Sequence, residues 1–202
     1  MFMRKSAFPV LLLFFLFSVG VVFVSQKQQE LRSRASANTT LALLPYTSIT
    51  SPITKRVGDM VSFDVILTPG SNQVSTVKVH IVFDSSVFEV SEKNGFVINK
   101  KAFPFAVEGP LINNDDGSVI ATFFVGADPN QTIKAPTKVG TLTLTAIRET
   151  YNLSSSKIFF EETSQAYSVS SQDYAYENVI ATTLPAYVVV RPRDAVAVPT
   201  KS

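Results

Sequence analysis

The stretch DMVSFDVILTP, residues 59–69, carries the clearest structural pattern in this 202-residue chain. Apolar residues alternate with polar ones, as in a strand that buries one face. The predicted buried set is Val61, Phe63, Val65 and Leu67. Residues 76–84, TVKVHIVFD, repeat the alternation with Val77, Val79, Ile81 and Phe83 inward. Because the turn-forming residues 69–72 separate the two stretches, we predict that they pair as adjacent antiparallel strands.

Working outward, further short segments with strand character are separated by turns rich in glycine, proline and asparagine. They are residues 41–44, 87–90, 95–98, 118–125, 140–148, 157–161, 178–182 and 186–191. No amphipathic helix follows residue 24. The sequence therefore predicts an all-β protein, an antiparallel jelly-roll β-sandwich of about nine strands.

The composition excludes several classes of chemistry. Cysteine is absent and histidine occurs once, at His80, which excludes disulfides, thiolate metal sites, cysteine nucleophiles and multi-histidine metal sites. Residues 38–202 contain 13 basic and 15 acidic residues, a net charge of −2, and so provide no basic surface for nucleic acid. We predict no cofactor.

Residues 7–24, AFPVLLLFFLFSVGVVFV, are uncharged and long enough to cross a bilayer. Because the nearest small-residue cleavage motif, residues 35–37, lies well beyond this run, we favour an uncleaved signal anchor over a cleaved signal peptide. The predicted segments are a short cytoplasmic end (1–6), the transmembrane anchor (7–24), a polar linker (25–38), an extracellular sandwich (39–191) and a flexible tail (192–202). Basic residues flank the run on both sides, so a reversed, cytosolic orientation remains the alternative.

No catalytic constellation is apparent, and we predict a protein that is not an enzyme. A G-x-S-x-G nucleophile motif is absent, and the strand alternation points His80 away from the core. The oxygen-rich run NNDDG, residues 113–117, fails as an EF-hand loop because Ile112 and Phe123 would occupy positions that require carboxylates. We predict a hairpin turn there and no metal site.

Tyrosines late in the chain suggest one alternative function, carbohydrate binding. Tryptophan is absent, but Tyr167, Tyr174 and Tyr176 cluster near the polar run SSQDYAYEN. Tyr174 and Tyr176 would share one face of an extended segment and could stack on a sugar ring. The other interpretation is that one of these rings covers the core and the other packs under a loop.

Several motifs resemble those of cohesin domains. Val57-Gly58-Asp59 leads into VSFDVIL, Phe83-Asp84 ends the next strand, and Gly140 leads into TLTLTAI, in the order and spacing of a cohesin. The resemblance covers residues 39–191. Ser85 departs from the family, which usually has proline after this aspartate.

The resemblance implies a nine-stranded jelly roll whose outer sheet face binds a dockerin, a small calcium-loaded module of another protein. It would place residues 76–84 in that face. The predicted partner-binding residues are Thr76, Lys78, His80 and Val82, with Thr122 and Phe124 from a neighbouring strand. Cohesins often have Asn or Asp where Thr76 and Lys78 stand, so their polar recognition pattern does not carry over. The sequence thus predicts a membrane-anchored, surface-displayed module that tethers a dockerin-like protein, with a polysaccharide-binding module or a purely structural envelope component as alternatives.

Overall fold

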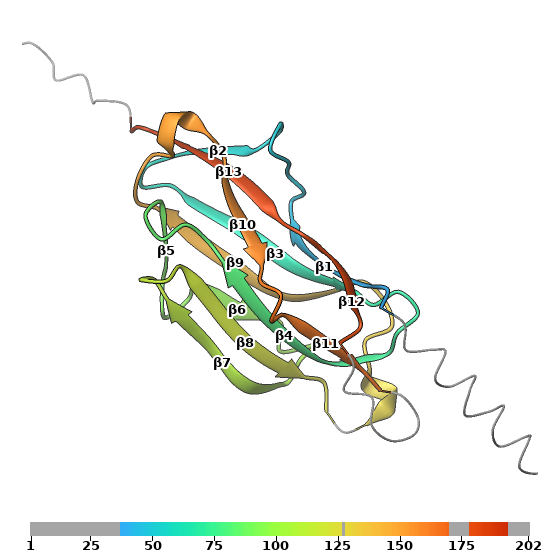
Figure 1. Ribbon diagram of the computed structural model, residues 1–202. Helices are drawn as coiled ribbons and strands as arrows, with labels where there is room; N and C mark the ends of the chain where they lie inside the picture. The colour runs from blue at the N-terminus through green and yellow to red at the C-terminus, as the bar shows by residue number, and fades with distance from the viewer. Residues whose placement is uncertain (1–36, 127, 170–177, 194–202) are drawn as a thin grey trace, which may run out of the picture.

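The computed structural model describes residues 37–126, 128–169 and 178–193, which form two β-sheets packed face to face (Figure 1). One sheet has six strands in the order β12-β1-β3-β9-β5, with β6 also paired to β9. Its strands are β1 (Thr39–Leu44), β3 (Met60–Thr68), β5 (Phe88–Val90), β6 (Phe96–Ile98), β9 (Thr137–Ala146) and β12 (Ile180–Leu184).

The other sheet has seven strands in the order β2-β13-β10-β4-β8-β7, with β11 also paired to β4. Its strands are β2 (Ile53–Arg56), β4 (Val74–Val82), β7 (Phe105–Asn113), β8 (Ser118–Phe124), β10 (Ser156–Phe160), β11 (Gln165–Ser168) and β13 (Ala186–Arg191). Two short 3₁₀ helices, η1 (Pro129–Gln131) and η2 (Tyr151–Leu153), lie in connections.

The predicted all-β sandwich is confirmed, but two details of the prediction are wrong. The described residues contain 13 strands instead of about nine, because β2, β7 and β11 lack a clear alternating pattern. The sheets are also mixed, since β1 pairs with β12 in parallel and β13 pairs with β2 in parallel. A proline, Pro185, separates β12 from β13, and the chain changes sheets there.

The predicted pairing of residues 59–69 with 76–84 is also wrong. Strand β3 lies between β1 and β9, whereas β4 lies in the opposite sheet beside β8. The turn after β3, in which Gly70 has a φ of +63° and the Asn72 N–H donates to the Pro69 carbonyl, therefore carries the chain across the sandwich. The alternation correctly predicted which side chains are buried, because facing a core requires the same pattern in either sheet.

The core fills the space between the sheets with the predicted inward residues and a cluster of phenylalanines. The rings of Phe96 and Phe123 stack with centroids 5.9 Å apart, and Phe103 contacts Phe123 at 6.3 Å. The largest fully buried side chains include Phe63, Phe88, Phe103, Phe123, Leu142 and Leu144. Since the strands of both sheets contribute, the sandwich has one continuous core.

The predicted hairpin turn at residues 113–117 is confirmed between β7 and β8. The Asn113 side-chain oxygen accepts hydrogen bonds from the backbone N–H groups of Asp115 and Asp116, and Gly117 has a φ of +67°. The Asn114 amide bonds to both the N–H and the carbonyl of Val90, at 2.8 and 2.9 Å. The oxygen-rich run thus serves to close the hairpin and to join it to β5.

The predicted membrane anchor, residues 7–24, and the tail beyond residue 193 lie outside the described residues. Within the part of the chain that the structure describes, no helix has the length and apolar character to cross a membrane. The sandwich begins with β1 at Thr39 and its last strand, β13, ends at Arg191. The two ends of the described chain lie at opposite ends of the sandwich (Figure 1).

Candidate functional site

The six residues predicted to bind a partner lie together on the outer face of the seven-stranded sheet. Thr76, Lys78, His80 and Val82 are the half-buried residues of β4, alternating with buried ones. Thr122 and Phe124 have the same orientation on β8. The strand register places Thr76 opposite Phe124 and Lys78 opposite Thr122, so the six lie on one contiguous surface. We call the solvent-facing side of β7, β8, β4 and β11 the outer face.

An aromatic row crosses one end of the outer face. The register aligns Phe105 of β7, Phe124 of β8, Thr76 of β4 and Tyr167 of β11. The rings of Phe105 and Phe124 lie 6.4 Å apart, a distance at which aromatic side chains attract each other. The Tyr167 hydroxyl donates a 2.6 Å hydrogen bond to the Gln165 side chain, which fixes its polar end.

A polar row follows it, with Glu108, Thr122, Lys78 and Gln165 aligned across the same four strands. The Thr122 hydroxyl donates to the Glu108 carboxylate at 3.2 Å. Thr122 therefore lies between an acidic and a basic side chain. The row therefore presents one negative charge, on Glu108, and one positive charge, on Lys78, to a partner.

The next row is largely apolar, with Leu111 and Ile120 aligned with His80. The His80 Nδ1 atom forms a 2.6 Å hydrogen bond with the Thr163 hydroxyl, and its backbone N–H donates to the Ser164 hydroxyl. Because these bonds hold His80 against the connection between β10 and β11, we assign it a structural contribution to the face. Beyond it, Val82 pairs with Phe159, whose ring lies 4.8 Å from the Lys157 ammonium nitrogen.

Three apolar residues of the outer face were not predicted as site residues: Phe105, Leu111 and Ile120. Phe105 and Leu111 remain 55% and 56% exposed, and they are informative because they extend a contiguous apolar patch with Phe124 and Ile120. Both lie on β7, an edge strand whose register shifts twice around residues 106–111. Glycine and proline at positions 109 and 110 interrupt the alternation, so no strand was predicted there. A strand could have been predicted there from the apolar residues before and after Gly109-Pro110.

The outer face of the other sheet has a different character. Asp64 forms a 2.7 Å ion pair with Lys138, and the hydroxyls of Ser62 and Thr143 are hydrogen bonded. Partial burial raises the pKa of Asp64, but hydrogen bonds from Lys138 and Thr141, together with the Lys138 charge, outweigh this and lower it. That face also exposes two apolar side chains, Met60 and Val97, but its central polar groups are paired with one another. On the seven-stranded sheet, apolar side chains of neighbouring strands gather into one surface, which makes that sheet the better candidate for an interface.

The residues of the carbohydrate alternative are only partly visible. Tyr167 lies in the aromatic row, whereas Tyr174 and Tyr176 lie outside the described residues, so their stacking remains a prediction. Among the described residues no cluster of three or more potential metal ligands occurs.

Comparison with solved structures finds cohesin domains. CaCohA2 from Clostridium acetobutylicum matches with a TM-score of 0.54 at 15% identity, over 77% of this chain and 92% of that chain. The third cohesin of ScaC, solved with the ScaB dockerin of Acetivibrio cellulolyticus, has a TM-score of 0.56 at 13% identity, over 75% of this chain and 98% of that chain. A non-cellulosomal cohesin from the archaeon Archaeoglobus fulgidus has a TM-score of 0.52 at 10% identity, over 77% of this chain and 92% of that chain.

No protein-family model and no curated protein matches the sequence. The resemblance seen in the sequence motifs is nevertheless confirmed in three dimensions, and the described residues form a cohesin-like domain. At these identities the likeness establishes the fold and leaves the function to be argued from the site.

Proposed function

We propose that this protein is a binding module that holds a dockerin-like protein on the outer face of the seven-stranded sheet. The observation that carries the proposal is the apolar surface formed by exposed Phe105 and Leu111 and half-buried Phe124 on the face where the sequence predicted a partner. The fold adds support, because solved cohesins of the same fold include complexes with dockerins.

The arrangement of the face suits a protein interface. Aromatic side chains near the centre of an interface contribute most of its binding energy, while polar neighbours determine orientation. Here the aromatic row and the Leu111 row flank the polar row of Glu108, Thr122 and Lys78. We therefore expect apolar contact to dominate the affinity and the two charges to select among partners.

The experiment uses the full chain, purified in a mild detergent and immobilised, with purified dockerin modules from the source cell and the ScaB dockerin as probes. Each is tested with calcium and with a chelator. Phe105→Glu is compared with Val97→Glu, a matched variant because Val97 is also 55% exposed but lies on β6 in the other sheet. We expect Phe105→Glu alone to weaken binding by at least about tenfold, the effect of losing about 1.4 kcal/mol.

Two results would overturn the proposal. In one, none of the dockerins binds in the presence of calcium. In the other, Val97→Glu weakens binding as much as Phe105→Glu, which would exclude the outer face as the interface. If soluble polysaccharides bind instead, and replacement of Tyr174 or Tyr176 by alanine abolishes that binding, the carbohydrate alternative replaces the protein partner.

We also propose that residues 7–24 anchor the module in the cell membrane and that residues 25–38 space the sandwich from it, on the extracellular side. The support is the apolar run itself and the basic residues before it. Because the chain has no cysteine, single cysteines report orientation directly. We expect a membrane-impermeant maleimide to label Ser33→Cys but not Ser6→Cys in intact cells, and the reverse pattern would exclude this orientation.

A further inference from the structure

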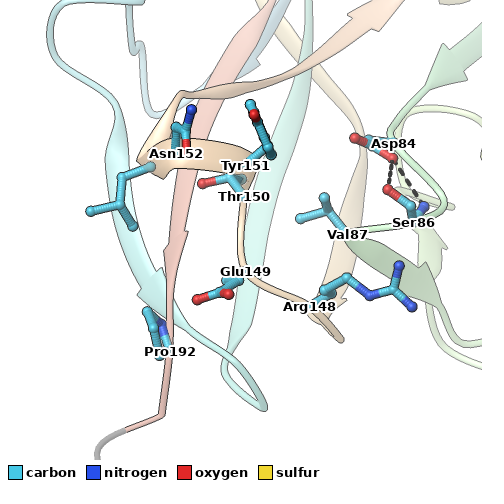
Figure 2. A pocket seen from close by; sticks show the side chains of 10 residues that line it. Asp84, Ser86, Val87, Arg148, Glu149, Thr150, Tyr151, Asn152 and Pro192 are labelled. Carbon is cyan, nitrogen blue, oxygen red and sulfur yellow. Dashed lines mark hydrogen bonds between the residues drawn. The ribbon is translucent and has the colours of Figure 1, made fainter.

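A surface hollow of about 730 Å³ lies at the end of the sandwich where β13 ends (Figure 2). Three segments that are distant in sequence enclose it: the turn after β4, the connection from β9 to β10, and Pro192 after β13. Tyr151 of the connection and Asp84 of the turn lie on two sides of it (Figure 2). We call it the end groove. It shares no residue with the outer face.

The connection that forms one wall is held firmly in place. Thr150 is buried, and its hydroxyl donates to the Val190 carbonyl of β13 at 3.3 Å while its backbone N–H donates to the same carbonyl at 3.0 Å. The Ser154 hydroxyl donates to the Tyr151 carbonyl at 2.6 Å. Tyr151 therefore projects from a backbone that is anchored on both sides.

The same connection contains two left-handed residues that are not glycine. Asn152 has a φ of +48°, which asparagine tolerates, whereas Leu153 has a φ of +56°, a conformation that is unfavourable for leucine. The strain does not serve the core, because Tyr151 is 83% exposed and Leu153 is also exposed. Strained backbone that holds apolar side chains out in solvent beside a hollow is typical of a binding site.

The charged side chains at the groove keep hydrogen-bonding capacity that the described residues do not use. Arg148 and Glu149 are exposed, and within the residues that the structure describes neither side chain forms a hydrogen bond or an ion pair. Asp84 accepts hydrogen bonds from the Ser86 N–H and hydroxyl through one oxygen, Oδ1, at 2.9 and 2.6 Å. A guanidinium group and two carboxylates can therefore all bond to a ligand.

We infer that the end groove binds a neutral glycan. A pyranose ring has an apolar face that would pack on the exposed Tyr151 ring, and hydroxyl groups around its edge that would bond to Arg148, Glu149 and Asp84. The lining carries one guanidinium and two carboxylates, so no single sign of charge dominates it, which suits an uncharged ligand whose hydroxyl groups both donate and accept hydrogen bonds. Val87, Leu153 and Pro192 supply an apolar lining beside the polar groups.

The position of the groove agrees with an extracellular ligand. Figure 1 shows η2 and the end of β13 at the end of the sandwich opposite the start of β1. If residues 7–24 anchor the chain as proposed above, the groove lies at the end of the sandwich opposite the one to which the anchor is attached. Only this orientation depends on the anchor, because glycan binding by the groove rests on the groove residues alone.

The test measures binding of four soluble hexasaccharides, of glucose, xylose, mannose and N-acetylglucosamine, to the full chain in detergent by calorimetry and by saturation transfer from protein to sugar. Tyr151→Ala is compared with Tyr151→Phe, which keeps the ring, and with Tyr46→Ala, which removes an exposed tyrosine that does not line the groove. We expect at least one sugar to bind, Tyr151→Ala to weaken it about tenfold, and the other two variants to have little effect.

Arg148→Gln should weaken the same sugar without unfolding the chain, since Arg148 is exposed. The proposal is overturned if none of the four sugars binds, or if one binds equally well to the wild type and to Tyr151→Ala. Dockerin binding should be unchanged in Tyr151→Ala. Loss of sugar binding and loss of protein binding therefore report on the two sites separately.

Discussion

Neighbouring phenylalanines on β8 offer the sharpest test of how this strand is oriented. Phe123 is fully buried and contacts the rings of Phe96 and Phe103, whereas Phe124 is half-buried on the outer face and contacts Phe105. Phe123→Ala removes a whole ring from a packed core, which destabilises by about 4 kcal/mol. Phe124→Ala removes a partly solvated ring and one aromatic contact, which we place at about 1 kcal/mol.

Urea unfolding followed by circular dichroism measures both values. With a slope of about 2 kcal/mol per molar urea, the midpoint should fall by about 2 M for Phe123→Ala and by about 0.5 M for Phe124→Ala. For partner binding we expect the opposite order, with Phe124→Ala having the larger effect. Phe124→Ala should reduce dockerin affinity while the chain stays folded, because it removes the centre of the aromatic row.

Equal destabilisation by the two variants would refute this reasoning, because it would mean that β8 does not present alternate residues to the core and to solvent. A Phe124→Ala chain that binds its partner with undiminished affinity would refute the assignment of the aromatic row to the interface. Tyr46→Ala, at an exposed loop position, controls for the loss of a ring as such.

Three further predictions concern the framework of the two sheets. Gly117→Ala should lower stability by about 1–3 kcal/mol in thermal unfolding, because φ is +67° and a Cβ would collide with the Phe83 carbonyl oxygen. Asp115→Ala in the same turn is the control and should change little. Asn114→Ala should destabilise by about 1–3 kcal/mol, since the Val90 N–H and carbonyl lose their partners, while exposed Asp115→Ala should not. Asp64→Asn should remove about 0.5 kcal/mol at pH 7, a small value because both side chains of the ion pair are 42% exposed. Folding lowers the pKa of Asp64, so the stabilisation by its charge is fully present above the unfolded pKa of about 3.9 and disappears as the pH falls through the folded pKa. The wild type and Asp64→Asn should therefore have equal stability near pH 2.

The alternating residues show how far sequence reasoning reaches in this protein. Val77, Val79 and Ile81 are buried as predicted, and Thr76 and Lys78 lie on the opposite face as predicted. The same pattern could not reveal that β3 and β4 belong to different sheets. An inward-facing residue meets an apolar surface in either sheet, so the alternation carries no information about the hydrogen-bonded partner.

Strand β7 shows the other limit. Its residues 105–113 include Gly109-Pro110 and are mostly exposed, so they display neither the alternation nor the burial by which strands are recognised. It forms as an edge strand because β8 provides a hydrogen-bonding edge, although the register shifts around the interruption. As a consequence, the sequence predicted Thr122 and Phe124 as site residues but missed Phe105 and Leu111 beside them.

The sequence by itself determined the all-β class, the inward residues of each recognised strand, the turn at residues 113–117 and the absence of thiol chemistry. These are local properties, set by side-chain alternation, turn preference and composition. Only the tertiary structure decided which strands are neighbours, which apolar residues complete the outer face, and that residues 84–87, 148–153 and 192 meet around the end groove. Such meetings depend on the packing of the whole core, because residues separated by many positions come together only where the combined burial outweighs the entropy of closing the loops between them.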